Sequence, residues 1–122
     1  MNVLLGIGGS DDSFRALEQT VARAQAAGDD LTIAVLQNPE SDRDPEVIVS
    51  RVHEMLEQAS FAAELRHLSG DPGSQLVALA ERGKFDQVVL GGGQRSPMGK
   101  IKLGHIAEFV LLNSPVTVTL VR

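Results

Sequence analysis

The fold class is decided by the stretch VLLGIGGSDDSFRALEQTVARAQAAGDDLTIAVL, residues 3–36. It opens with an apolar run, passes a polar turn at 9–13 and closes with a second apolar run at 31–36. Between the runs, apolar residues recur at three- and four-residue spacing, which predicts an amphipathic helix ending near Gly28. These residues are Phe14, Leu17, Val21 and Ala24. A strand, a helix and a second strand in this order form the unit from which parallel sheets are built.

The same alternation continues to residue 122. Asp44-Pro45 and Asp71-Pro72 each place a capping residue before a proline, which predicts two further helix starts. Apolar spacing predicts a fourth helix around Ile106 and Val110. Three more strands are predicted at 61–68, 85–90 and 115–122. Strands separated by helices run parallel with right-handed crossovers, so we expect a single α/β domain over residues 1–122, an open sheet with helices on both faces.

Composition narrows the function classes. The chain is 43% hydrophobic and 22% charged, has a net charge of -5 and contains no cysteine. The negative charge and the lack of Trp and Tyr argue against a nucleic-acid partner. No apolar run reaches the roughly 20 residues that cross a bilayer, so we expect no membrane role and a cytoplasmic protein. Without cysteine, disulfides and thiolate metal sites are excluded.

The position of a binding site follows from the topology. In open parallel sheets, ligands bind beyond the carboxyl ends of the strands, where the loops 8–13, 36–38 and 91–99 are predicted to lie. Two of these loops are rich in glycine, which lets backbone amides approach a phosphate group. The alternative is that the first glycine cluster is only a tight turn between strand and helix. The sequence leaves both interpretations open.

Two common phosphate-binding motifs fail here. Residues 6–11, GIGGSD, have the first two glycines of a dinucleotide fingerprint, but Asp11 stands where the third glycine belongs. Residues 93–100 resemble a Walker loop, yet five residues separate the glycines instead of four, and Ile101 replaces the required Ser or Thr. Neither motif is accepted.

A third pattern fits the whole chain. The stretch GGGQRSPMGKIKLGHIAEFVLLNSPVTVTLVR, residues 91–122, resembles the C-terminal signature of the universal stress protein family. The N-terminal signature is matched by Gly9-Ser10, Ser13 and Ala16-Leu17, and Gly70-Asp71-Pro72 is a further shared feature. The resemblance implies a sheet with strand order 3-2-1-4-5, as in the adenine nucleotide alpha hydrolases. It also implies a stress-response module that binds ATP or AMP, with no metal beyond an accompanying Mg, and that forms a homodimer.

The resemblance also implies which residues hold the nucleotide. They are Ile7, Gly8, Gly9, Leu36, Gly91, Gly92, Gly93, Gln94, Arg95, Gly104, His105 and Ile106. Three of them depart from the family pattern: Gly8 replaces an Asp, Gln94 replaces a glycine and His105 replaces a hydroxyl residue. If Gln94 has to be left-handed, these changes together cost on the order of 3–5 kcal/mol of binding free energy, which predicts weak nucleotide binding. Arg95 and Lys100 stay available as cationic partners for phosphate.

Other functions were weighed against this one. A phosphorylation-receiver domain has a similar topology and an acidic pair like Asp11-Asp12, but the acceptor Asp is missing where strand 61–68 ends. The acids are better explained as partners of a helix dipole. The three histidines, His53, His67 and His105, are too dispersed for a metal site. No residue is predicted to be catalytic, and ATP hydrolysis is the hypothesis with least support.

The pattern of the last predicted strand indicates a protein partner. In 116–121, valine and leucine alternate with threonine, which is typical of a half-buried edge strand, and no charge interrupts it before Arg122. An uncharged edge of this kind can pair with a second chain, so a homodimer through Val116–Val121 is expected. The alternative to nucleotide binding is a dimeric interaction or signalling protein of the same fold that has lost the ligand.

Overall fold

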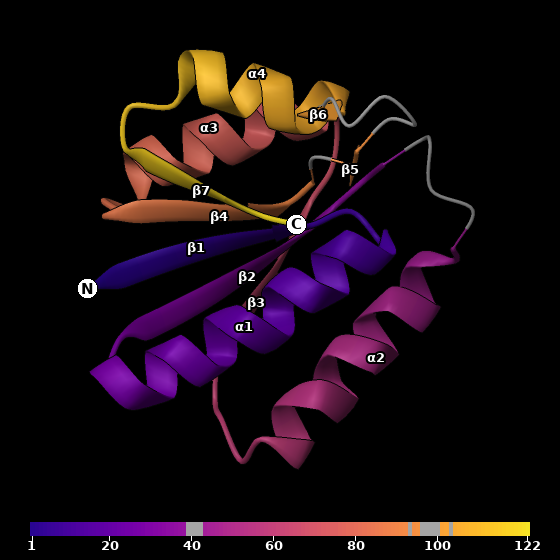
Figure 1. Cartoon of the computed structure of the whole chain (residues 1–122), viewed down its shortest axis with the longest axis vertical. Helices are drawn as coiled ribbons and strands as arrows, with labels where there is room; N and C mark the ends of the chain where they lie inside the picture. The colour runs from indigo at the N-terminus through magenta and orange to yellow at the C-terminus, as the bar shows by residue number, and fades with distance from the viewer. Residues whose placement is uncertain (39–42, 93, 96–100, 103) are drawn as a thin grey trace.

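Five strands form one parallel sheet, and its order is β3-β2-β1-β4-β7 (Figure 1). The computed structural model describes residues 1–38, 43–92, 94–95, 101–102 and 104–122. The strands of the sheet are β1 Asn2–Ile7, β2 Asp30–Leu36, β3 Glu64–Leu68, β4 Gln87–Gly91 and β7 Thr117–Val121. Numbered along the chain as the five predicted strands, this is the order 3-2-1-4-5, so the predicted fold class is confirmed.

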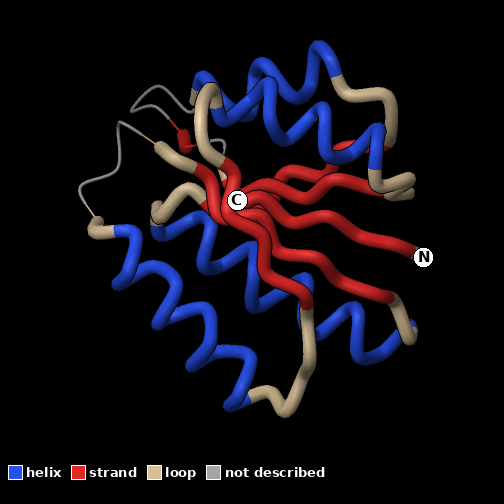
Figure 2. The backbone as a smooth tube through the Cα atoms, turned by 180° about the vertical axis from the view of Figure 1, so that it is seen from behind, coloured by secondary structure: helices blue, strands red, loops and turns tan. Residues whose placement is uncertain are grey.

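Helices cover both faces of the sheet (Figure 2). The helices α1 Asp11–Ala27 and α2 Pro45–Gln58 lie on one face, and α3 Pro72–Arg82 and α4 His105–Asn113 lie on the other. Alternation along β1 divides the core, because Val3, Leu5 and Ile7 pack toward α1 and α2 whereas Leu4 packs toward α3 and α4. All four of these side chains are buried, as expected for a central parallel strand.

The helix starts follow the predicted capping pattern. The Asp44 carboxylate accepts a hydrogen bond from the backbone N–H of Glu46 at 2.9 Å, and Pro45 follows as the first helical residue. Asp71 accepts from the N–H of Ser74 at 2.9 Å, and its hydrogen bonds from Ser74 lower the pKa of the Asp71 carboxyl. The two Asp-Pro pairs therefore fix where α2 and α3 begin.

Three predicted strands begin later than expected; the last begins at Thr117 and not at residue 115, and the other two begin late for a shared reason. The strands predicted from residues 61 and 85 start at Glu64 and Gln87. Phe61 donates its N–H to the Leu56 carbonyl at 3.0 Å, and Phe85 donates to the Ala80 carbonyl at 3.3 Å. These bonds close the ends of α2 and α3, so each phenylalanine belongs to the end of a helix.

The segment after β4 contains a feature that the sequence did not predict. Strand β5, Gln94–Arg95, lies within the glycine-rich loop predicted over 91–99 and pairs antiparallel with β6, Ile101–Lys102, just beyond that loop. Two residues per strand are too short to produce a recognisable alternation.

Candidate functional site

The loops after β1, β2 and β4 meet at one edge of the sheet. β1 lies between β2 and β4, with Ile7 opposite Val35 and Gly6 opposite Leu90. All three strands run parallel, so their carboxyl ends point the same way, as the sequence predicted. Most of the described residues expected at the site are therefore neighbours in space.

Gly91, at the end of β4, lies directly against the start of α1, which follows the other glycine loop. A Cβ atom at this position would lie 2.3 Å from the backbone carbon and oxygen of Asp12 and 2.5 Å from the nitrogen of Ser13. The start of α1 thus occupies the space that any side chain at residue 91 would need. The glycine is required here by backbone packing, a role that does not depend on a ligand.

Three of the expected site residues offer little side chain to a ligand. Ile7 is fully buried and Leu36 is nearly so, each within the core on its own face of the sheet. Ile106 is half-buried and packs against the core formed with α3 and α4. These residues can contact a ligand mainly through their backbones.

Among the described residues, the α4 side of the site is open around one glycine. Gly104 caps α4 in an extended conformation with φ -72° and ψ 165°, and no described atom lies within 4 Å of where its Cβ would be. His105 follows as the exposed first residue of the helix. Backbone N–H groups in the first turn of an α-helix have no acceptor within the helix, so those of Ile106 and Ala107 are directed toward this edge.

Two backbone observations bear on the expected ligand contacts of this side. The N–H of Gly92 donates to the carbonyl of Val121 at 3.0 Å, so it is not an additional donor for a phosphate. Gln94 lies in a strand, paired with Lys102, so the condition for a left-handed penalty at this position is not met. Gly93 and Lys100 lie outside the described residues, as do the side chains of Gln94 and Arg95.

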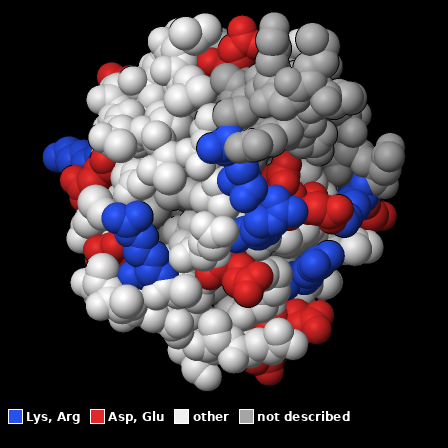
Figure 3. Space-filling model, viewed as in Figure 1, with Lys and Arg blue, Asp and Glu red and all other residues white. Residues whose placement is uncertain are grey.

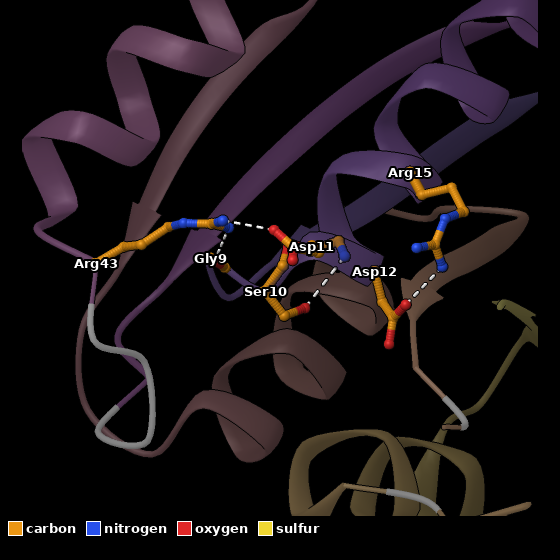
Figure 4. A network of polar contacts seen from close by, with 7 residues as sticks. Gly9, Ser10, Asp11, Asp12, Arg15 and Arg43 are labelled. Carbon is orange, nitrogen blue, oxygen red and sulfur yellow. Dashed lines mark hydrogen bonds and ion pairs between the residues drawn. The ribbon is translucent and has the colours of Figure 1, made fainter. Parts of the chain in front are cut away.

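The β1 side is held by an arginine that the sequence analysis missed (Figure 4). The Arg43 guanidinium donates through one nitrogen to the carbonyl of Gly9 and through the other to the Asp11 carboxylate, both at 2.5 Å. The same guanidinium lies 5.1 Å from the centre of the Phe14 ring, and that of Arg51 lies 4.4 Å from it. Gly9 itself turns at φ 90°, a conformation that favours glycine.

The arginines neutralise the two acids at the start of α1. Arg43 holds the pKa of the Asp11 carboxyl below its usual range, first through its hydrogen bond and then through its charge. Arg15 forms an ion pair with Asp12 at 2.6 Å. Two unpaired carboxylates beside an anionic ligand would repel it, and these pairings reduce that repulsion.

Asn38 takes the space beside Gly8. Its Nδ2 atom donates to the Gly8 carbonyl at 3.2 Å and would lie 3.1 Å from a Cβ at residue 8. Asn38 lies in the loop 36–38 that the sequence predicts at this edge, but no role was predicted for it, and Arg43 was not predicted at the site at all. A usable signal existed for Arg43, because it directly precedes the Asp44-Pro45 helix start, which the topology places at this edge of the sheet.

A hollow of about 110 Å³ lies elsewhere, between α1 and the strands β4 and β7. Its polar lining includes Thr20, Arg23 and Gln87, and the Gln87 amide donates to the Thr119 hydroxyl. None of the predicted site residues lines it.

Within the described part of the chain, no three His, Cys, Asp or Glu side chains are grouped so that they could hold a metal ion. His53 is an exposed residue of α2. None of the described helices combines the length and the apolar character that a membrane span requires.

Comparison with known proteins identifies the family. The model of the universal stress protein family matches residues 1–122. The chain belongs to the universal stress protein family. A universal stress protein of Methanocaldococcus jannaschii is 30% identical over 74 residues, 61% of this chain and 44% of that protein. One from Methanothermobacter thermautotrophicus is 40% identical over 63 residues, 52% of this chain and 41% of that protein. The matched stretch thus spans less than half of either relative.

Solved universal stress proteins share the fold. One from Archaeoglobus fulgidus superimposes with a TM-score of 0.79 at 21% identity, covering 100% of this chain and 98% of the other. A universal stress protein in complex with cAMP gives a TM-score of 0.77 at 27% identity, covering 100% and 97%. An Arabidopsis thaliana family protein with AMP bound gives 0.72 at 16% identity, covering 99% and 90%.

Proposed function

We propose that this universal stress protein is a cytoplasmic, homodimeric module that binds an adenine nucleotide, or another phosphate-bearing ligand, weakly at the glycine loops after β1 and β4. It works as a binding protein, and no three His, Cys, Asp or Glu side chains of the described residues are grouped to hold a metal ion. Magnesium enters only as the companion of a bound nucleotide.

The open start of α4 carries the ligand proposal. No described atom fills the Cβ side of Gly104, and the first-turn amides of the helix form a partial positive charge that attracts phosphate. Structural relatives bound to cAMP and AMP support an adenine nucleotide as the ligand class. Gly8, Gln94 and His105 stand where the family pattern has other residues, and these departures support weak binding.

Calorimetry of the nucleotide-stripped protein tests this. Titration with AMP, cAMP or Mg-ATP is expected to release or absorb heat and to saturate below about 1 mM, a binding free energy of about -4 kcal/mol or stronger. Adenosine and inorganic phosphate separate the contributions of base and phosphate. No heat and no thermal shift at several millimolar would overturn the ligand proposal.

The edge strand β7 supports the homodimer. Val121 accepts a hydrogen bond from Gly92, so the backbone groups of Thr117, Thr119 and Val121 face β4. Because the direction alternates along a strand, the N–H and C=O groups of Val118 and Leu120 face the open edge. Antiparallel pairing about Thr119 would place Val118 opposite Leu120 of a second copy and form four hydrogen bonds.

One observation favours the second candidate, an interaction protein that has lost the nucleotide. The Asn38 side chain lies where a side chain at residue 8 would extend, so an acid of the family pattern would fit there only if Asn38 shifted. A dimer that binds no phosphate ligand in the calorimetric experiment would support this candidate.

A further inference from the structure

The hollow between α1 and the sheet has an apolar floor. Alternation along β1, β4 and β7 places Val3, Val89 and Val121 on the face that α1 covers, and all three line the hollow. Above them, α1 presents two short side chains, Thr20 and Ala24, one turn apart. Short side chains at these positions leave about 110 Å³ between helix and sheet. The space-filling view shows a recess left of its centre, where basic atoms lie beside an uncharged area (Figure 3).

Thr20 brings a hydroxyl group to this hollow. The residue is only 7% exposed, and its hydroxyl forms no hydrogen bond within the described part of the chain. The side-chain nitrogens and oxygens of described residues that are fully buried all have hydrogen-bond partners, so the Thr20 oxygen keeps contact with accessible space. That space is the hollow, which Thr20 lines.

The sheet side of the hollow adds further hydrogen-bond donors. The Gln87 amide donates to the Thr119 hydroxyl, and both residues line the hollow. An amide nitrogen carries two hydrogens and a hydroxyl carries one, so the second Gln87 N–H and the Thr119 proton can each serve a ligand. Donors on both the helix and the sheet favour a ligand that accepts hydrogen bonds.

Arg23 gives the rim of the hollow a positive charge. Its side chain is exposed, and it forms no ion pair with the carboxylates of the described residues. Asp29 also lines the hollow, but its carboxylate pairs with the amino group of Met1 at 3.3 Å, which reduces its repulsion of an anion. Thr20 and Arg23 are three residues apart and therefore lie on the same side of α1. A guanidinium group beside a hydroxyl donor suits a carboxylate, which can accept two parallel hydrogen bonds from arginine.

We propose that this hollow binds a short aliphatic carboxylate. Arg23 and Thr20 hold the carboxylate group, and the valines of the floor contact the hydrocarbon part. The volume sets the size of the ligand: an apolar cavity of about 150 Å³ holds benzene, so about 110 Å³ suits a ligand of roughly four to six heavy atoms. A nucleotide is far too large for this space, so the site is separate from the one after β1 and β4.

NMR titration of the ¹⁵N-labelled full chain with sodium butyrate tests the proposal, with sodium chloride at equal concentrations as the reference. We expect saturable shifts at Thr20, Gln87 and Thr119, with a dissociation constant at or below about 10 mM, because a ligand of this size has a limited binding free energy. 1-Butanol keeps the chain but lacks the charge, and should bind at least about fivefold more weakly. Inorganic phosphate should cause no saturable shift at Thr20. Affinity equal to that of butyrate for either compound would overturn the proposal.

Two variants test the contacts of the carboxylate. Arg23→Gln should raise the dissociation constant of butyrate at least about fivefold. Arg82→Gln removes the same charge from an exposed position of α3, on the other face of the sheet, and should leave the constant unchanged. Thr20→Val keeps a similar shape without the hydroxyl, so the protein should stay folded in a thermal scan while butyrate binds about threefold more weakly.

An absence of saturable butyrate shifts around the hollow in the wild type would overturn the proposal. The same butyrate affinity in Arg23→Gln as in the wild type would also overturn it. Neither result affects the nucleotide proposal, since AMP binding is measured at the start of α4 and not at the hollow.

Discussion

On the β1 side of the candidate site, Arg43 and Asn38 reach across from the segment after β2 and hold the carbonyls of Gly9 and Gly8. The α4 side contains Gly92 and Gly104. A Cβ at Gly92 would lie 3.6 Å from the Cβ of Ala107, and a Cβ at Gly104 would have no described atom within 4 Å. One side is filled and fixed by the protein's own side chains, and the described residues of the other side offer backbone and leave space. We therefore expect a ligand to gain most of its binding free energy at α4.

Gly91→Ala gives the largest expected effect, because this residue joins the two sides. The added Cβ would collide with the backbone of Asp12 and Ser13, so unfolding should become easier by about 1–3 kcal/mol. Gly104→Ala is the matched control, and its cost should stay below about 1 kcal/mol because its backbone suits any residue. Urea unfolding measures both. An equal loss of unfolding free energy in the two variants would contradict the tight packing at Gly91 and the free space at Gly104.

Gly104→Val should weaken ligand binding without destabilising the fold. A branched side chain at this open position blocks the approach to the first turn of α4, so AMP affinity should fall about tenfold or more, equivalent to about 1.4 kcal/mol. Calorimetry measures the affinity, and thermal unfolding checks that the protein stays folded. Unchanged AMP affinity in a folded variant would show that AMP does not bind at the start of α4.

Arg43→Ala should weaken AMP binding by a smaller factor, about three- to fivefold. The change frees the Asp11 carboxylate and releases the Gly9 carbonyl, which adds negative charge at the edge of the site. Arg66→Ala, which breaks an exposed pair with Glu64 on β3, serves as the control and should leave AMP affinity unchanged. An effect of the same size in both variants would mean that net charge alone is responsible.

The smallest expected effect concerns pH. The Asp11 pKa is lowered in the folded state by Arg43, so this pair stabilises the protein above the ordinary carboxyl pKa and the contribution is lost as pH falls through the lowered value. The difference in melting temperature between wild type and Arg43→Ala should be constant from about pH 7 to 5 and shrink below about pH 4. Asp71 titrates in both proteins, so its effect cancels. A difference that grows on acidification would contradict the pairing.

The sequence predicts the parts of this molecule that are local or periodic. The buried runs of β1 and β2, the Asp44-Pro45 and Asp71-Pro72 caps and the uncharged edge strand all follow from patterns within a few residues. The roles of Gly91, Arg43 and Asn38 do not, because each depends on a contact with a residue 30 or more positions away or with the backbone of another element. The family pattern drew attention to Gly91 but could not show that α1 is the group packed against it.

The most direct test follows backbone amide chemical shifts of the ¹⁵N-labelled, nucleotide-stripped protein as AMP is added. Binding at α4 predicts progressive, saturable shifts at Ile106 and Ala107, smaller ones at Gly9, and none at Arg66 on the far edge of the sheet. Saturable shifts confined to Thr20 and Gln87 beside the hollow under α1, or no shifts at all at several millimolar AMP, would contradict the placement of the ligand at the start of α4.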